Sequence, residues 1–117
     1  MKQKINIGTD IIEVDRFRKK PIRKNRKFYA SIFTKLELKH CQNYSDIYPH
    51  LAGIFSAKEA VIKCVDLPLK LADIEVSWDK NGRPLVIINS KKNNVHISIS
   101  HTKSLAIAVA VNLMLNL

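Results

Sequence analysis

The sequence predicts a single α+β domain in which a mostly antiparallel sheet packs on one long helix. Three features predict it: a helical stripe of apolar residues over 50–65, several short segments of alternating apolar and polar residues, and turn residues between those segments. A length of 117 residues agrees with one domain over 1–117, and no internal repeat divides the chain.

The N-terminal third predicts a strand, a helix and a basic segment. Lys4–Ile12 begins with alternating apolar residues and predicts a strand that ends near Asp10. Glu13–Lys20 has a helical pattern, and Pro21 ends this helix because proline has no backbone donor. Residues 16–27 carry eight basic side chains and no acidic one, so this segment is a candidate for contact with an anionic partner.

Two more helices are predicted in the middle of the chain. Thr34-Lys35-Leu36-Glu37 has the pattern of a capping box, with a hydroxyl at the cap and a glutamate three residues later, and predicts a helix to about Cys41. A loop is expected at 43–49. The longest helix is expected from His50 to about Val65, and its apolar stripe consists of Leu51, Ile54, Phe55, Val61, Ile62 and Val65.

The C-terminal half predicts four strands. Residues 73–78 and 84–89 flank Asp79-Lys80-Asn81-Gly82, a strong signal for a hairpin turn. Residues 95–101 alternate cleanly, with isoleucine and valine on one face and polar side chains on the other. In the last strand, 105–111, large apolar residues alternate with alanines, so both faces can be covered and the strand is expected to be central.

Charge and composition narrow the class of protein. The net charge of +10, from 20 basic and 10 acidic side chains, predicts an anionic partner: nucleic acid, an acidic protein, a phosphorylated ligand or a membrane surface. Cys41 and Cys64 form neither a metal-site spacing nor a disulfide framework, so reduced thiols are expected. No apolar signal core or membrane-length segment is present, so a soluble, cytoplasmic protein is expected.

Four side chains are candidates for chemistry at the first strand and on the long helix. Asp10 follows a strand beside a glycine, although an isolated residue of this kind is most often a turn or cap aspartate. Glu59 and Lys63 have the i, i+4 spacing of a surface ion pair worth about 0.3–0.5 kcal/mol, yet they flank the apolar stripe, where a carboxylate is well placed to hold a cation. Lys58 lies inside the stripe, where its stem can be buried while its ammonium reaches an anion or a subunit contact beyond the helix.

Ser100-His101-Thr102 ends a predicted strand and offers a further polar cluster. A serine nucleophile is disfavoured because no nucleophile-elbow glycines surround it and adjacent strand residues point to opposite faces. A histidine that helps to hold a phosphate is the preferred interpretation, and a polar strand end is the alternative. Together, the candidates suggest two oxygen ligands, a lysine and a histidine around one phosphate-rich ligand, as magnesium-assisted attack on a pyrophosphate requires.

Four segments together resemble holo-acyl-carrier-protein synthase, the small bacterial type of 4′-phosphopantetheinyl transferase. The first is Ile7–Glu13, and the second is the helix motif His50–Lys63. The third is the hairpin 73–84 with its Asn81-Gly82-Arg83-Pro84, and the fourth is Val95–Thr102. Their order and spacing extend over nearly the whole chain.

The resemblance implies transfer of phosphopantetheine from coenzyme A to a serine of acyl carrier protein, in support of fatty acid biosynthesis, by a trimer with active sites between subunits. It implies Mg²⁺ held by Asp10 and Glu59, with Lys63 stabilising the attacked phosphate. The serine hydroxyl must lose its proton, and Glu59, acting directly or through a metal-bound water, is the candidate base. It places coenzyme A against Lys58, Lys63, Asn81, Gly82, Arg83, Pro84, His101 and Thr102. It assigns docking of the acidic carrier protein to Arg16, Arg23, Lys24, Arg26 and Lys27.

Two departures from the family pattern keep an alternative open. The family usually has an arginine where this chain has Ile54, and a glycine-rich turn where this chain has the shorter 64–70. Weaker coenzyme A binding is therefore expected, unless Lys70 or other lysines compensate. The alternative is a basic nucleic-acid- or carrier-protein-binding module without catalysis, which the basic residues at 16–27 favour.

Overall fold

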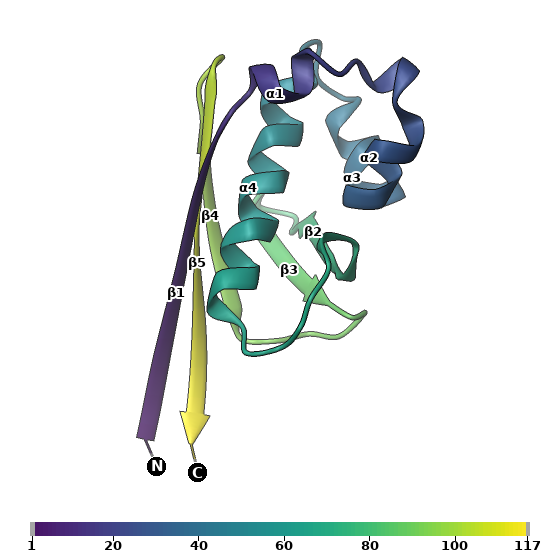
Figure 1. Ribbon diagram of the computed structural model, residues 1–117. Helices are drawn as coiled ribbons and strands as arrows, with labels where there is room; N and C mark the ends of the chain where they lie inside the picture. The colour runs from purple at the N-terminus through teal and green to yellow at the C-terminus, as the bar shows by residue number, and fades with distance from the viewer. Residues whose placement is uncertain (1, 117) are drawn as a thin grey trace.

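A computed structural model describes residues 2–116, with side chains described for 4–114. The helix α4 lies between a three-stranded sheet on one side and a two-stranded sheet with the helices α2 and α3 on the other, and α1 lies across the upper end of α4 (Figure 1). The strands are β1 (Lys2–Glu13), β2 (Ile74–Trp78), β3 (Pro84–Ile88), β4 (Val95–His101) and β5 (Leu105–Asn116). The helices are α1 (Asp15–Arg18), α2 (Arg26–Ile32), α3 (Lys35–Cys41) and α4 (Tyr48–Cys64), with 3-10 turns η1 (Ile22–Lys24) and η2 (Leu71–Asp73).

The larger sheet is antiparallel with the order β1-β5-β4, so the prediction that the last strand is central is confirmed. The alanines of β5, at 106, 108 and 110, are buried beneath α4 and let the helix lie close to the sheet. The alternate residues Leu105, Ile107 and Val109 point to the other face, where they are 39–42% exposed. One face of the central strand is therefore not covered within this chain.

The first strand is longer than its sequence pattern indicates. β1 continues to Glu13, and Ile11 and Glu13 pair with Ile107 and Leu105 of β5. The prediction of a strand that ends near Asp10 is wrong because pairing with a distant strand keeps the chain extended past the local signal. The following helix is accordingly short, and α1 covers only Asp15–Arg18 of the predicted 13–20.

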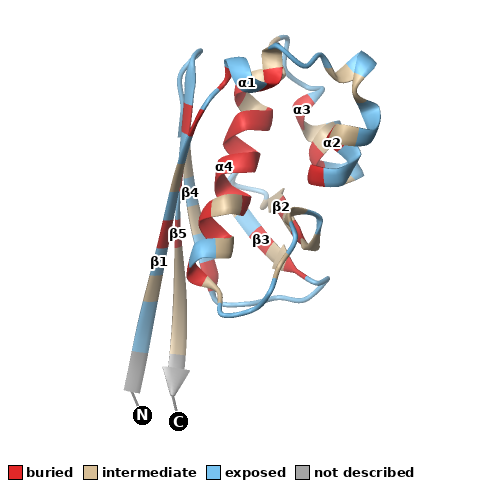
Figure 2. Cartoon of the chain, viewed as in Figure 1, coloured by how far each residue is buried: buried red, intermediate tan, exposed pale blue. Residues whose placement is uncertain are grey.

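The long helix is buried around most of its circumference, where the sequence predicts a single stripe (Figure 2). It begins at Tyr48, two residues before the predicted start, with Pro49 in the first turn, where a missing backbone donor costs nothing. It ends at Cys64, since Val65 is already extended. Sheet strands contact one side of α4, while α1, α3 and β2 contact other sides, so small polar residues such as Ser56 are also buried.

Glycines set the distance between this helix and the sheet. A Cβ at Gly8 would overlap the carbonyl oxygen of Ala60, so only glycine lets β1 run this close to the backbone of α4. A Cβ at Gly53 would lie 2.9 Å from Cγ2 of Ile99, so α4 is also close to β4. These two contacts hold opposite ends of α4 against opposite edges of the sheet.

An aromatic cluster joins the basic segment to the core. Phe17 of α1 packs edge-to-face on Phe55 of α4, with ring centroids 5.4 Å apart. The hydroxyl of Tyr29 donates to the carbonyl oxygens of Phe17 at 3.1 Å and Lys20 at 2.8 Å. Burial raises the pKa of Tyr29 to about 12, so it remains a neutral donor. The aromatics between the basic residues therefore hold α1 and α2 on α4.

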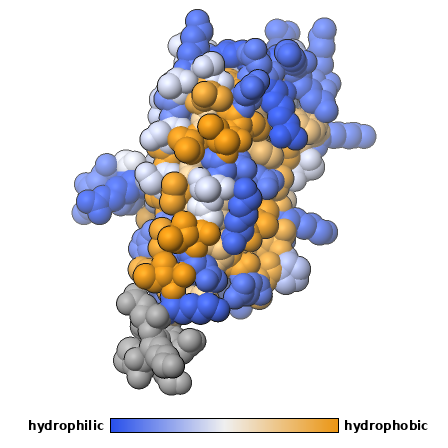
Figure 3. Space-filling view, turned by 60° about the vertical axis from the view of Figure 1, so that its left-hand side comes forward, coloured by the Kyte–Doolittle hydropathy of each residue, from blue (hydrophilic) through white to orange (hydrophobic). Residues whose placement is uncertain are grey.

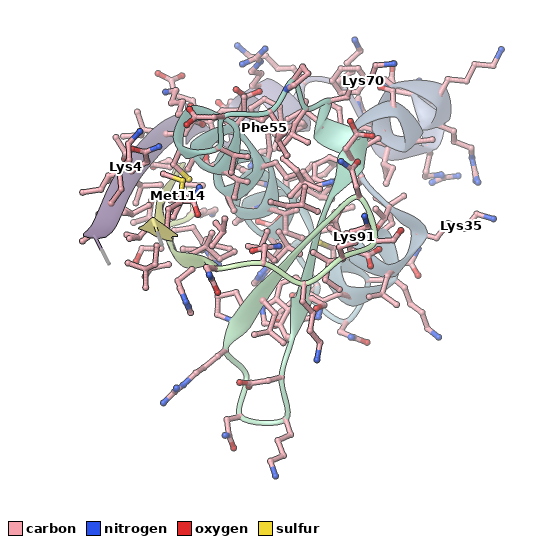
Figure 4. The ribbon with its side chains drawn as sticks, turned by 90° about the horizontal axis from the view of Figure 1, so that it is seen from below. Lys4, Lys35, Phe55, Lys70, Lys91 and Met114 are labelled. Atoms are coloured by element: carbon pink, nitrogen blue, oxygen red, sulfur yellow. The ribbon has the colours of Figure 1, made fainter. Side chains whose placement is uncertain are left out.

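The hairpin between β2 and β3 is confirmed, and it projects from the body of the molecule (Figure 4). Oδ1 of Asp79 accepts from the backbone N–H groups of Asn81 at 2.8 Å and Arg83 at 2.9 Å. Gly82 has a φ of +81°, which glycine adopts without steric cost. The turn therefore presents residues 81–84 beside the start of α4.

Candidate functional site

The first polar cluster lies where β1 crosses the C-terminal half of α4. Nζ of Lys63 donates to the carbonyl oxygen of Thr9 at 2.8 Å and lies 3.7 Å from Oδ1 of Asp10. The side chain of Asp10 is 18% exposed, whereas that of Lys63 is 54% exposed. Glu59 is half-buried and precedes Lys63 by one helical turn. Among the described side chains, Lys63 forms its ion pair with Asp10 and not with Glu59.

The Gly8–Ala60 contact explains why these residues meet. It holds the strand against the helix beside Glu59, so the carboxylate that leaves the strand and the lysine on the helix come together. Of the described residues, no group of three or more His, Cys, Asp or Glu side chains could hold a metal ion. Two carboxylates fit Mg²⁺ nevertheless, because this ion is usually bound by one or two carboxylates, with phosphate and water oxygens completing the shell.

Lys58 does not point toward a ligand. Its side chain is fully buried, with Nζ 2.7 Å from Oε1 of Glu37 and donating to the carbonyl oxygen of Ile32 at 2.6 Å. Glu37 also accepts from the backbone N–H groups of Val76 at 2.6 Å and Thr34 at 2.9 Å. Desolvation lowers the pKa of Lys58 and raises that of Glu37, and the attraction between them opposes both shifts.

The prediction that the ammonium of Lys58 leaves the apolar stripe is therefore wrong, and the expected contact with coenzyme A is corrected to an internal ion pair. The physical reason is a buried partner from another helix. The capping box at Thr34 is confirmed, but it accounts for only one oxygen of Glu37. The ion pair of Glu37 with Lys58 in the core has no local sequence signal.

The second polar cluster lines a pocket of about 230 Å³ between α3, the start of α4, the hairpin and the end of β4. Its walls include His40, Tyr44, His50, Ile54, Trp78 and His101. Gly82 and Pro84 of the hairpin also line it. The structure thus brings together several residues that the resemblance assigns to coenzyme A. Asn81 and Arg83 are exposed on the same turn.

Thr102 lies just beyond the pocket and follows the last residue of β4. Its Oγ1 accepts from the backbone N–H groups of Ser104 at 3.3 Å and Leu105 at 3.1 Å, which turns the chain into β5. It shares a neighbouring surface hollow with His50, His101 and Lys103. The serine of Ser100-His101-Thr102 is exposed on the strand and pairs in register with Ile107.

Four aromatic residues of the pocket were not predicted as site residues from the sequence: His40, Tyr44, His50 and Trp78. Two stacked pairs form the wall, with ring centroids 3.6 Å apart for His40–Trp78 and 3.5 Å apart for Tyr44–His50. Burial lowers the pKa of His40 and, with nearby imidazoles, the pKa of His50. These residues come from separate elements, so no sequence spacing connects them.

The two clusters lie on opposite sides of α4. Nine residues, or 2.5 turns of ideal helix, separate His50 from Glu59, which places them on opposite faces and about 13 Å apart along the axis. The sequence predicts a lysine and a histidine around one ligand, whereas a single chain holds Lys63 at the β1 edge and His101 at the β4 edge.

The basic segment is not one helix. Its exposed cations are distributed over α1, η1 and α2, as the side chains of Arg16, Arg23, Lys24, Arg26 and Lys27. Arg18 differs from them because it donates to both carboxylate oxygens of Asp46, at 2.9 and 2.6 Å. Within residues 2–116, no helix is long and apolar enough to cross a membrane.

Comparison with known proteins assigns the class. The sequence model of the 4′-phosphopantetheinyl transferase superfamily matches residues 6–110. A holo-[acyl-carrier-protein] synthase from Thermoanaerobacter sp. strain X514 is 38% identical, and the match covers 90% of this chain and 84% of that protein. One from Clostridium tetani is 37% identical, and the match covers 92% of this chain and 94% of that protein. This chain therefore belongs to the 4′-phosphopantetheinyl transferase superfamily.

Among solved structures, this chain is similar to one type of enzyme in that superfamily. A holo-(acyl-carrier-protein) synthase from Bacillus anthracis in complex with CoA (3′,5′-ADP) has a TM-score of 0.79 and 35% identity, and the match covers 94% of this chain and 96% of that one. The Helicobacter pylori enzyme in complex with coenzyme A has a TM-score of 0.77 and 28% identity, covering 92% and 99%. These similarities confirm the predicted α+β fold and the predicted family.

Proposed function

We propose that this chain is a holo-acyl-carrier-protein synthase, with 1–117 forming one transferase domain. It transfers the 4′-phosphopantetheine arm of coenzyme A to a serine of apo-acyl carrier protein, releases 3′,5′-ADP, and thereby supports fatty acid biosynthesis in the cytoplasm. The observation that carries the proposal is the contact of Lys63 with Asp10 and Thr9, one turn from Glu59, in a chain of this superfamily.

In the proposed reaction, the serine oxygen of the carrier protein attacks the β-phosphorus of coenzyme A. The new bond joins that oxygen to phosphorus, and the bond from phosphorus to the bridging oxygen breaks, so the electron pair leaves with 3′,5′-ADP. Glu59 accepts the serine proton. Lys63 places its positive charge where negative charge develops on the phosphoryl oxygens. Asp10 and Glu59 would hold Mg²⁺, which would neutralise charge on the pyrophosphate.

We propose a homotrimer on the basis of the family resemblance, and the exposed apolar side chains on the outer face of the large sheet support self-association (Figure 3). The large apolar side chains on this face are 39–66% exposed, and they are Ile5, Ile7, Ile11, Leu105, Ile107 and Val109. Large exposed apolar patches mark contacts between proteins. Assembly also accounts for the separation of the two clusters within one chain. The Asp10–Lys63 cluster of one copy and the pocket of the next copy can together form one site.

The exposed cations of α1, η1 and α2 support docking of an acidic carrier protein. Arg16, Arg23, Lys24, Arg26 and Lys27 are all exposed, and Arg18, which lies among them, is neutralised by Asp46. A positive surface accelerates encounter with an acidic protein, and salt weakens this effect. No nucleic acid or membrane partner is needed to account for the charge.

The test is mass spectrometry of an apo-acyl carrier protein after incubation with the chain, coenzyme A and Mg²⁺. The carrier should gain the mass of phosphopantetheine. Glu59→Gln should slow transfer by about 10²–10⁴-fold, because it removes the base and a carboxylate ligand. Glu13→Gln, at the exposed end of β1, is the matched control and should retain activity.

Full activity of Glu59→Gln would remove this residue from the mechanism. Absence of transfer by the unmodified chain, together with tight RNA binding that weakens linearly with the logarithm of salt concentration, would instead favour the binding module.

A further inference from the structure

Arg18 lies in the basic segment, yet its guanidinium group is engaged within the chain. Nη1 and Nη2 donate to the two carboxylate oxygens of Asp46 at 2.9 and 2.6 Å. Nη2 also donates to the carbonyl oxygen of Lys103 at 3.2 Å. One side chain of α1 therefore joins the loop 42–47, which precedes α4, to the turn between β4 and β5.

The two segments that Arg18 joins line the same surface hollow. This hollow has a volume of about 420 Å³ and is lined by residues 44–46 of the loop and by residues 101–103 at the end of β4 and in the turn. Tyr44, His50 and His101 line both this hollow and the pocket between α3, α4 and the hairpin, so the two adjoin. Arg18 lines neither of them, and its contacts hold their walls without facing a ligand.

The loop 42–47 has no other long-range hydrogen bond among the described residues. Its remaining hydrogen bonds join groups at most four residues apart, such as the backbone N–H of Tyr44 with the carbonyl oxygen of Cys41 at 3.2 Å. Tyr44 stacks on His50 with ring centroids 3.5 Å apart. The position of this wall of the pocket therefore depends on the pair of Arg18 with Asp46.

The geometry makes this pair stronger than an ordinary surface ion pair. An exposed pair contributes little by itself, but two parallel hydrogen bonds between a guanidinium and a carboxylate fix the distance and the orientation of both groups. Cζ of Arg18 also lies 5.9 Å from the ring centroid of Tyr48, the first residue of α4. The hydrogen bond from Arg18 lowers the pKa of Asp46, so the carboxylate is ionised at neutral pH.

We propose that Arg18 and Asp46 are positioning residues for coenzyme A and do not dock the carrier protein. They hold the loop that carries Tyr44 and the turn that follows His101 in the arrangement that binds coenzyme A. This inference rests on the proposed function, in which the pocket beside that loop belongs to the coenzyme A site. The place of Arg18 in the basic segment suggests docking instead, but its charge is already neutralised by Asp46.

The experiment measures transfer with Mg²⁺ while the concentrations of coenzyme A and of apo-carrier protein are varied in turn, and measures the dissociation constant of coenzyme A by calorimetry. Arg18→Gln and Asp46→Asn should each raise KM and Kd for coenzyme A by about threefold to tenfold, because ordering the loop then opposes binding. The kcat and the KM for the carrier protein should stay within about twofold.

Arg23→Gln is the matched contrast, because Arg23 is an exposed arginine of the same segment with no carboxylate partner among the described side chains. It should raise the KM for the carrier protein and leave coenzyme A binding unchanged. The double variant Arg18→Gln, Asp46→Asn should weaken coenzyme A binding no more than Arg18→Gln does, since the two residues act through one contact.

A raised KM for the carrier protein with unchanged coenzyme A binding in Arg18→Gln would overturn the inference and place Arg18 in the docking surface. Unchanged kinetics, a fall confined to kcat, or additive effects in the double variant would overturn it as well. Thermal unfolding identifies a variant that has lost its fold, and Asp46→Asn, which keeps the size of the side chain, then carries the comparison.

The measurement of binding separates this inference from the proposed function. If the unmodified chain binds coenzyme A but transfers nothing, the proposed function fails, and the dissociation constants of the variants still decide the inference. If the unmodified chain does not bind coenzyme A, both fail. If it transfers phosphopantetheine and Arg18→Gln binds coenzyme A as tightly, only the inference fails.

Discussion

Replacing Lys58 by methionine would leave the carboxylate of Glu37 in the core without its cation. Both side chains are fully buried and 2.7 Å apart, so no water can take the place of the lysine without opening the core. Removing one member of a buried pair costs about 3–5 kcal/mol. For a domain of 117 residues, an unfolding entropy of about 2.1 cal/mol/K per residue converts this cost into a fall in Tm of about 12–20 °C.

The assay is thermal unfolding at one fixed protein concentration, since any self-association makes Tm depend on concentration. The double variant Lys58→Met, Glu37→Gln should be less destabilised than the sum of its single variants, because it leaves no unpaired charge in the core. Lys39→Met, at an exposed position of α3, is the control and should change stability by less than about 0.5 kcal/mol. A Lys58→Met variant as stable as the Lys39→Met control would refute the buried pair.

Two further predictions follow from the packing of α4 and from the large sheet. Gly8→Ala should lower the free energy of unfolding, measured with urea, by about 1–3 kcal/mol and should also slow transfer, because its methyl group would push Lys63 away from Asp10. Asn6→Ala on the same strand is the control. Equal effects of the two changes would count against the contact. Ile107→Lys should shift the chain toward monomer in size-exclusion chromatography with light scattering and lower its activity, because it places a charge on the exposed apolar face. Leu36→Lys is the control, because Leu36 is an exposed apolar residue of α3 away from the large sheet, and it should not change the mass. An unchanged mass for Ile107→Lys would place the interface elsewhere.

Local signals in the sequence were sufficient for several elements. The hairpin at 79–82, the capping box at Thr34 and the strand 95–101 follow from residues within a few positions of one another. The long helix and the central position of the last strand follow from periodicity alone. The family was predictable because its motifs are recognised by their residues and by their order and spacing along the sequence.

Other features depend on residues far apart in sequence. β1 continues past Asp10 because β5 pairs with it, and no local pattern within 11–13 records that partner. Lys58 is buried because Glu37 reaches the same point from another helix, although its own sequence context suggested a surface contact. The imidazole pocket gathers residues from α3, α4 and β4, so it became visible only in three dimensions.

By itself, the sequence determined the family and most of the strands and helices, and it offered candidates for contact with a phosphate. Only the tertiary structure decided that Asp10 meets Lys63 across the Gly8 contact, and that His101 lies with His50 on the other side of the helix. The physical reason is that periodicity specifies which residues share one face of an element, whereas packing specifies what that face touches.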